Sequence, residues 1–405
     1  MTDAINQDQI DYDQIDCDSH IQEGGGTWET YVEAAYADRR PAVIDNPYVS
    51  QRPRRDKTWY IDGQLIPKNQ GPGGVVMSTP VEMAFAQGKP VPPDIQSCKD
   101  AAGRATMTLD TGIRRTVLFS TLFLQAFTDD IGYEAALFSA WTRWMADVRS
   151  VAPDTLAFAA PIPLRDPALA AEAVVLAKAS GADTVMVLPA AGDMLLHDSR
   201  LDRFWATCQD LDMPVSVHIG WPQPWVTNTA TTPSTVFLGA FDTSMWWAYV
   251  SVLTGGILDR FPRLRIAFME NDCRFFEIFM ARAMHWFPTT AASPWPTRMS
   301  PMDVLRERQI YFSYEGDYAL LPGFMDLVGA DRVMAALDFP HTHYGEASLS
   351  ASFDFVRNHP AVDPAGKRML LRDAAKAFYG YPDDDFAPAA KAQPAATAQP
   401  AGALA

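Results

Sequence analysis

The sequence predicts an α/β protein built as a (β/α)8 TIM barrel, and three observations support this fold class. The 405-residue chain contains eight short apolar runs that alternate with amphipathic stretches. Turn residues bound the runs, as expected for parallel strands that are buried on both faces. No Gly-x-Gly-x-x-Gly pattern follows an early strand, so a doubly wound open sheet is the less favoured alternative.

The predicted strands and helices follow one another in a regular order. The strands cover residues 14–20, 115–120, 156–161, 184–189, 214–218, 264–270, 309–314 and 332–338. The helices cover residues 98–110, 131–149, 167–179, 200–211, 236–260, 273–287, 318–328, 346–358 and 365–379. The last helix ends at Gly380, with Pro382 beyond it, which is a typical helix stop. Together these elements predict one domain over residues 14–385.

A long segment without regular alternation interrupts this pattern. Residues 27–96 are rich in Pro, Arg and Gly, and we interpret them as an insertion after the first strand. The apolar runs on either side of Asp62-Gly63 predict a β-hairpin, which favours an ordered lid or contact arm. The polar residues 1–13 and the Ala- and Pro-rich residues 386–405 are expected to be a flexible start and a disordered tail.

Composition limits the partners and the cellular location that we expect for the protein. The net charge of −16 argues against nucleic acids and anionic membrane surfaces, which favour basic proteins. The longest apolar stretch, residues 245–258, is too short to span a bilayer. The four cysteines are scattered and the N-terminus lacks the pattern of a secretory signal. We therefore expect a cytoplasmic protein that binds a small-molecule substrate.

Side chains that can bind metal stand at the ends of four predicted strands. Asp18 and His20 end the first strand and His218 ends the fifth. Glu270 ends the sixth strand and Asp338 ends the eighth. Since the C-terminal ends of barrel strands meet at one face, these side chains are expected to converge. Two imidazoles with several carboxylates suit zinc, manganese or iron(II) better than magnesium.

Each of these residues also has a purely structural interpretation. Asp18 and His20 could form a surface turn, and His218 could be a core histidine bonded to a backbone carbonyl. Glu270 could cap the next helix, and Asp338 could belong to a turn. The coincidence of four strand ends favours the metal site over these separate explanations.

Four further residues are candidates for lining a substrate pocket. Trp221 follows the fifth strand closely and could form an apolar wall. His341 and His343 lie in the loop beyond the eighth strand, where they could position substrate. His197 follows the fourth strand and could either line the pocket or be exposed.

Six segments resemble the amidohydrolase-related (amidohydrolase 2) family, whose members include proteins like aminocarboxymuconate-semialdehyde decarboxylase. They are IDCDSH (15–20), VHIG (217–220), GILDRFPRL (256–264), GADR (329–332), LDFPH (337–341) and LRDAAKAFYG (371–380). The resemblance implies a (β/α)8 barrel, dimers or higher oligomers, and one divalent metal held by the four residues Asp18, His20, His218 and Asp338. One position departs from the family's decarboxylases, which usually carry a histidine where this chain has Glu270.

We expect a metal-dependent hydrolase that acts on a small carbonyl-containing molecule through a metal-activated water. Glu270, His218 and Asp338 are the expected catalytic residues, with Glu270 orienting or deprotonating the water. Zinc is the expected metal, with manganese or iron and a second ion as alternatives.

Three other functions stay open at this point. The same metal could support non-oxidative decarboxylation, as in a lyase. A non-heme dinuclear Fe/Mn oxygenase could use Glu270 as a ligand of a second ion. A non-catalytic barrel could serve as a subunit of a heteromer. The expected assembly is a homodimer or a hetero-oligomer with a related barrel subunit.

Overall fold

A computed structural model describes residues 13–24, 26–45, 57–66, 85–86, 89–223, 232–270, 273–287, 295–316, 320–341 and 349–386. The expectations for residues 1–12 and 387–405 lie outside these ranges.

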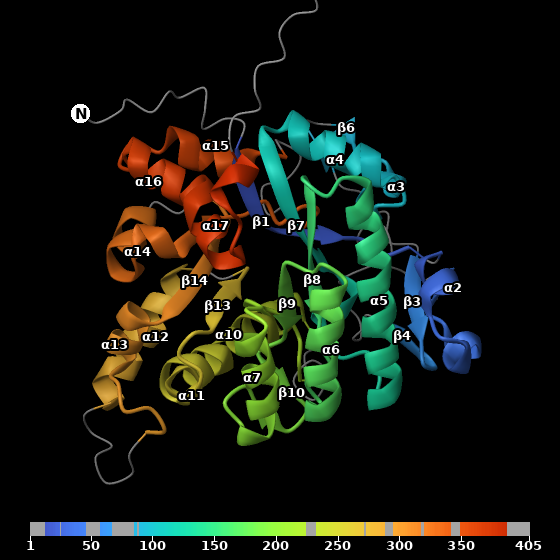
Figure 1. Cartoon of the computed structure of the whole chain (residues 1–405), viewed down its shortest axis with the longest axis horizontal. Helices are drawn as coiled ribbons and strands as arrows, with labels where there is room; N and C mark the ends of the chain where they lie inside the picture. Colours follow the sequence, from blue (N-terminus) through green and yellow to red (C-terminus); the bar gives the residue numbers. More distant parts are fainter. Residues whose placement is uncertain are drawn as a thin grey trace, which may run out of the picture.

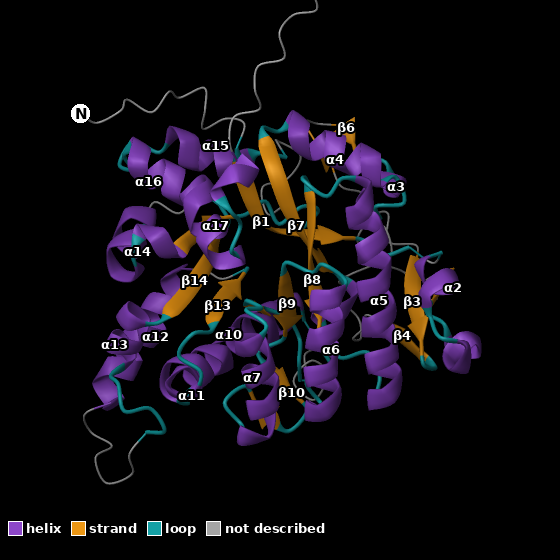
Figure 2. Cartoon of the chain, in the orientation of Figure 1, coloured by secondary structure: helices purple, strands orange, loops and turns teal. Residues whose placement is uncertain are grey.

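The strands confirm the predicted barrel (Figures 1 and 2). Eight parallel strands of the described chain form one sheet, in which each strand pairs with the next along the sequence. They are β1 (Gln14–Ile21), β7 (Ile113–Ser120), β8 (Leu156–Pro161), β9 (Thr184–Val187), β12 (Val215–His218), β13 (Arg265–Met269), β14 (Gln309–Tyr314) and β15 (Val333–Ala335).

The barrel is brought close to closure where the chain beyond β15 meets β1. The Asp338 amide donates to the Asp18 carbonyl at 2.8 Å, and the His20 amide donates to the Phe339 carbonyl at 2.6 Å. These two bonds hold the first and last strand ends together, so they also bring together three of the predicted site residues.

Helices cover the outside of the sheet (Figure 1). They are α4 (Ala101–Asp110), α5 (Ile131–Val151), α6 (Pro167–Ala179), α7 (Asp202–Asp210), α10 (Asp242–Tyr249), α11 (Ile257–Arg260), α12 (Cys273–Trp286), α13 (Pro301–Glu307), α14 (Leu321–Val328), α15 (Ala351–Asn358), α16 (Pro364–Arg368) and α17 (Ala374–Tyr379). The carboxylates of Asp130 and Asp166 accept hydrogen bonds from first-turn amides and so cap α5 and α6.

Some predicted bounds differ from those of the structure. The helix predicted over residues 236–260 is a series of α9 (Pro233–Val236), the π-helical η4 (Phe237–Phe241), α10, the π-helical η5 (Val250–Thr254) and α11. The last helix likewise contains a π-helical turn, η8 (Met369–Asp373), between α16 and α17. The strand predicted over residues 332–338 ends at Ala335, and α13 was not predicted.

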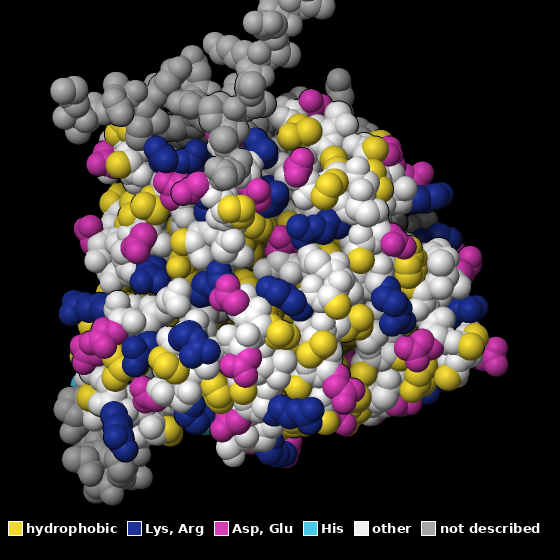
Figure 3. Space-filling model, in the orientation of Figure 1, with side chains coloured by type: hydrophobic (Ala, Val, Ile, Leu, Met, Phe, Trp, Pro, Cys, Tyr) yellow, Lys and Arg dark blue, Asp and Glu magenta, His cyan; other side chains and the backbone are white. Residues whose placement is uncertain are grey.

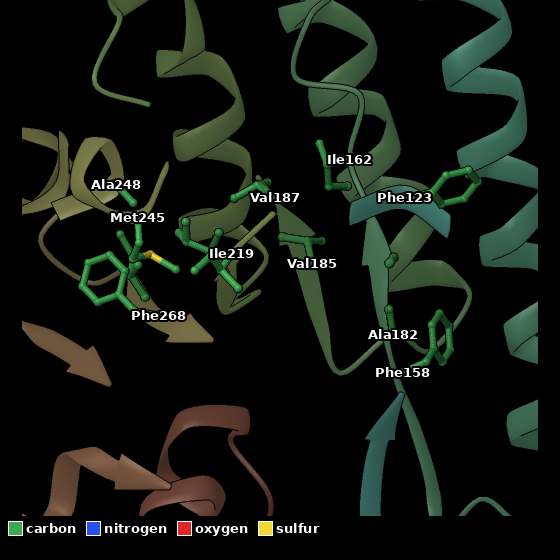
Figure 4. Packing of buried hydrophobic residues seen from close by; sticks show 14 of the residues in the cluster. Phe123, Phe158, Ile162, Ala182, Val185, Val187, Ile219, Met245, Ala248 and Phe268 are labelled. Carbon is green, nitrogen blue, oxygen red and sulfur yellow. The ribbon is translucent and has the colours of Figure 1, made fainter. Parts of the chain in front are cut away.

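The alternation of side chains along each strand produces two apolar layers. In β13, Ile266 and Phe268 belong to the cluster between sheet and helices, which also contains Met245 and Ala248 (Figure 4). Ala267, between them, belongs to the cluster inside the barrel. The barrel interior is therefore filled with side chains. A functional site is expected only at the ends of the strands.

The described part of the insertion contains a small three-stranded sheet beside the barrel. β3 (Lys57–Ile61) and β4 (Gln64–Ile66) pair antiparallel across Asp62-Gly63, as the sequence led us to expect, and β2 (Ala42–Asp45) adds a third strand. Trp28 follows β1 and contacts Trp59 of this sheet and Phe123 of the barrel, with ring centroids 6.4 and 5.9 Å apart. The insertion is thus attached to the barrel by aromatic packing.

The surface carries charges of both signs, which are interspersed on the face shown in Figure 3. Within the described ranges, no helix combines the length and the apolar character that a membrane crossing requires.

Candidate metal centre

Four of the predicted residues come together at the C-terminal end of the barrel. His20 Nε2 lies 3.6 Å from Asp18 Oδ1 and 3.4 Å from Asp338 Oδ1. His218 Nε2 lies 3.4 Å from Asp18 Oδ2. Side chains from β1, from β12 and from the segment after β15, up to 320 positions apart in the sequence, therefore share one buried space.

The metal-facing atoms of Asp18, His20 and His218 make no other hydrogen bonds within the described residues. Both carboxylate oxygens of Asp18, both ring nitrogens of His20 and Nε2 of His218 are buried without a hydrogen bond to any described residue. Burying so many polar atoms unsatisfied is costly, and a divalent cation would satisfy them together. Oxygen and imidazole nitrogen donors in this combination fit a zinc, manganese or iron(II) ion.

The tautomer of His218 also fits this role. Its Nδ1 lies 2.8 Å from the Ile219 carbonyl, which can only accept a hydrogen bond, so Nδ1 carries the proton. Nε2 then presents its lone pair toward Asp18. The backbone carbonyl bond proposed from the sequence as a reason for a plain core histidine is present, yet it orients the ring as a metal ligand needs.

Irregular backbone places the side chains at the strand ends. β1 changes its register against β7 between Asp16 and Ser19, which turns Asp18 and His20 toward the barrel axis. Glu270 and Asp338 adopt positive φ angles of 52° and 50°. Such a conformation is strained for residues other than glycine and is common at functional sites.

A second acidic group adjoins the first. One carboxylate oxygen each from Glu270, Glu315 and Asp338 lies within 4.8 Å of the others. Ser313 organises this group, because its Oγ accepts a bond from the Glu270 amide at 2.7 Å and lies 3.2 Å from Glu315 Oε1. The pKa values of Glu270 and Glu315 are raised well above the usual range. Burial is the largest cause, and the negative charge of Asp338 is the second.

Glu315 was missed in the sequence analysis, although a signal was available. It directly follows β14, the seventh barrel strand, so it occupies the same kind of position as Glu270 and His218. The ligands expected from the sequence all lie within predicted strands, and Glu315 is one residue beyond the end of its strand.

Asp16 supports the centre from outside it. Its carboxylate accepts hydrogen bonds from the Ser19 and Thr116 hydroxyls, both at 2.6 Å, and from the Leu337 amide at 2.9 Å. These bonds connect β1 to β7 and to the segment that carries Asp338. Burial raises the pKa of Asp16 to about 6.

The predicted pocket residues have different positions. His341 lies at the centre itself: its Nδ1 is 3.1 Å from Asp338 Oδ1 and its ring is 4.2 Å from that of His20. Trp221 is buried in the interior cluster with Phe119, whose ring is 5.2 Å from that of His218. His343 lies outside the described residues.

His197 does not join these residues. Its Nδ1 lies 3.1 Å from Ser251 Oγ, and its side chain lines a cavity with Trp246 and Trp295 on the outside of the barrel. None of the candidate groups of ligand atoms includes it. The position of the His197 side chain depends on its contact with η5, which is distant from His197 in sequence.

Similarity to known proteins agrees with this architecture. A decarboxylase of Emericella nidulans, orsB, is 23% identical over 154 residues, which span 36% of this chain and only 45% of that protein. An amidohydrolase structure from Mycobacterium avium subsp. paratuberculosis superposes with a TM-score of 0.72 at 19% identity, covering 91% of this chain and 99% of the other.

A dihydroxybenzoic acid decarboxylase from Polaromonas, solved with bound manganese and the inhibitor 2-nitroresorcinol, has a similar fold. It superposes with a TM-score of 0.57 at 20% identity over 69% of this chain and 85% of the other. The family model described as Amidohydrolase matches residues 124–381, which is more than half of the sequence. The chain therefore belongs to the amidohydrolase family.

Proposed function

We propose that this protein is a metal-dependent decarboxylase that releases carbon dioxide from a small aromatic carboxylic acid. The observation that carries the proposal is the set of buried, otherwise unsatisfied donor atoms of Asp18, His20 and His218 at the end of the barrel. The names of the similar proteins favour this alternative over the hydrolase expected from the sequence. Hydrolysis stays a prediction.

Asp18, His20, His218 and Asp338 would hold the ion, with His341 adjoining them. Such an ion supplies a Lewis acid that binds and orients the oxygens of an acidic substrate. The Ile219 carbonyl fixes the orientation of the His218 ring, and the bond from the His20 amide to the Phe339 carbonyl holds the backbone that carries His20. The protein's own contribution is thus a rigid, dry set of ligands.

Decarboxylation also needs a proton at the carbon that loses the carboxyl group. Glu270, Glu315 and Asp338 are too close together for all three to be ionised in a buried site without compensation. Glu270 lies 4.0 Å from His218 and is mostly buried, so a proton on its Oε2 would be held beside the substrate site. We infer that Glu270 delivers this proton, in place of the histidine usual in related decarboxylases.

The experiment is an assay of carbon dioxide release from a panel of hydroxybenzoic acids, with protein that has been loaded with manganese or with zinc. We expect release that is abolished by chelation, restored by the ion and independent of oxygen. A Glu270→Gln variant should keep its metal and lose most of its turnover. Hydrolysis of amides or esters without carbon dioxide release would contradict the proposal.

The two-ion oxygenase remains a second candidate because of the Glu270, Glu315 and Asp338 group. Three carboxylates next to a metal centre are the ligands that a second cation would require.

Metal content per chain separates the candidates. One ion in both the wild type and Glu315→Gln supports the decarboxylase. Two ions in the wild type, including iron, that fall to one in Glu315→Gln would favour the oxygenase.

A further inference from the structure

A separate cavity lies on the outside of the barrel, among α10, η5, α12 and the chain before α13. It has a volume of about 390 Å³, and it shares no residue with the candidate metal centre. These helices lie at the lower left of Figure 1. Its main walls are aromatic, with one guanidinium and one imidazole among them: Trp246, Phe279, Trp286, Trp295, Arg282 and His197. This size and lining suit a small organic ligand.

The wall around His197 is held firmly. Its Nδ1 lies 3.1 Å from Ser251 Oγ, and its carbonyl accepts a bond from Arg260 Nη2 at 3.3 Å. Gly255 lies directly against it: a Cβ at that position would be 2.3 Å from His197 Cβ. The glycine therefore permits the close approach that places the imidazole in the cavity wall.

The part of the lining that comes from α10 and α12 combines aromatic rings with a positive charge. Trp246 packs edge-on against Phe279, with ring centroids 5.2 Å apart. The Arg282 guanidinium carbon lies 5.6 Å from the ring centre of Trp286. No ion pair joins Arg282 to a carboxylate of the described residues, so its hydrogen-bond donors can serve an anion.

We propose that this cavity is a second binding site, which takes a small aromatic carboxylate apart from the metal centre. The tryptophan faces stack on the ring of the ligand, and Arg282 receives its carboxylate. The proposal does not rest on the proposed function, because none of its residues takes part in the metal centre.

Benzoate is the test ligand, and its binding to the metal-loaded protein is measured by calorimetry and tryptophan fluorescence. Ala283→Met fills the cavity from its buried floor, and Arg282→Gln removes the charge. Arg306→Gln on the neighbouring α13 is the matched control, since it removes an exposed charge that does not line the cavity. A His218→Asn background removes any binding at the metal centre from the signal.

We expect the outer site to persist in His218→Asn and in Arg306→Gln. Ala283→Met should abolish it, and Arg282→Gln should weaken it by about tenfold, as expected for loss of a charge-assisted contact. Neutral benzamide should bind about tenfold more weakly than benzoate for the same reason.

Three results would overturn the proposal. The first is unchanged benzoate affinity in both cavity variants, and the second is loss of all binding in His218→Asn. The third is a dimer in solution that dissociates in Trp286→Ala, because a second copy of the chain would then cover the cavity.

Discussion

At the scale of single residues, the candidate centre depends on which atoms have partners. His218 uses Nδ1 for the Ile219 carbonyl and keeps Nε2 for the centre, whereas both oxygens of Asp18 keep no other bond within the described structure. A sequence can show that these residue types end strands, but not which of their atoms are left unsatisfied. The distinction between a core histidine and a ligand therefore required the structure.

Replacing His218 should remove the metal and keep the fold. In His218→Ala we expect metal affinity to fall by at least tenfold to a hundredfold, because one of few ligands is lost. Metal content after dialysis is measured by mass spectrometry, and the fold is checked by circular dichroism. His285→Ala, which removes an exposed histidine at the end of α12, is the control. Full metal content in His218→Ala would refute the ligand assignment.

Glu23 makes the stability of the protein depend on pH. Its carboxylate accepts bonds from the Ser120 hydroxyl at 2.5 Å and the Trp141 indole at 2.9 Å, yet burial raises its pKa from 4.5 to about 7. The folded state therefore binds this proton more tightly than the unfolded state does. The resulting stabilisation is complete below pH 4.5 and is lost as the pH rises to 7.

The loss of this stabilisation by Glu23 should lower the free energy of unfolding by an amount on the order of 3 kcal/mol. Urea denaturation at pH 5 and pH 7.5 measures it, and in Glu23→Gln this part of the pH dependence should be absent. An identical pH dependence in the two proteins would show that Glu23 does not titrate in this range.

At the scale of elements, apolar runs predicted the strands well. Strands that are buried on both faces appear in the sequence as continuous apolar runs, which are easy to identify. The bounds of β8, β14 and α6 equal the predicted ones. The strand predicted over residues 332–338 was too long: β15 ends at Ala335, and Asp338 beyond it has a positive φ. The register change in β1 and the π-helical segments were not predicted, because local hydrophobic pattern carries no information on them.

The turn after β12 requires a glycine. A Cβ on Gly220 would lie 2.4 Å from the Leu124 carbonyl, which accepts the bond from the Trp221 amide at 2.7 Å. Gly220→Ala should therefore lower the free energy of unfolding by about 1–3 kcal/mol, measured by urea denaturation.

Gly323→Ala in α14 is the control, because a Cβ there meets no atom within 4 Å. It should leave stability unchanged or raise it by up to about 1 kcal/mol. Equal effects of the two substitutions would mean that the turn after β12 can relax.

At the scale of the whole molecule, the barrel accounts for the convergence of the candidate residues. Strand ends that are far apart in sequence meet at one face, so Asp18, His218 and Asp338 were predicted to converge before any distance was known. His197 was less predictable, because its cavity is formed by packing between η5 and α12. Fold and family could thus be inferred from pattern and motif, whereas the proposed chemistry depends on details of the site.

The most direct test of the account is an anomalous X-ray difference map from crystals of the manganese-loaded protein. We predict a peak within about 2.0–2.3 Å of donor atoms from Asp18, His20, His218 and Asp338. Absence of a peak at this place in a protein that retains stoichiometric manganese, or a peak held by other residues, would contradict the assignment of the metal centre.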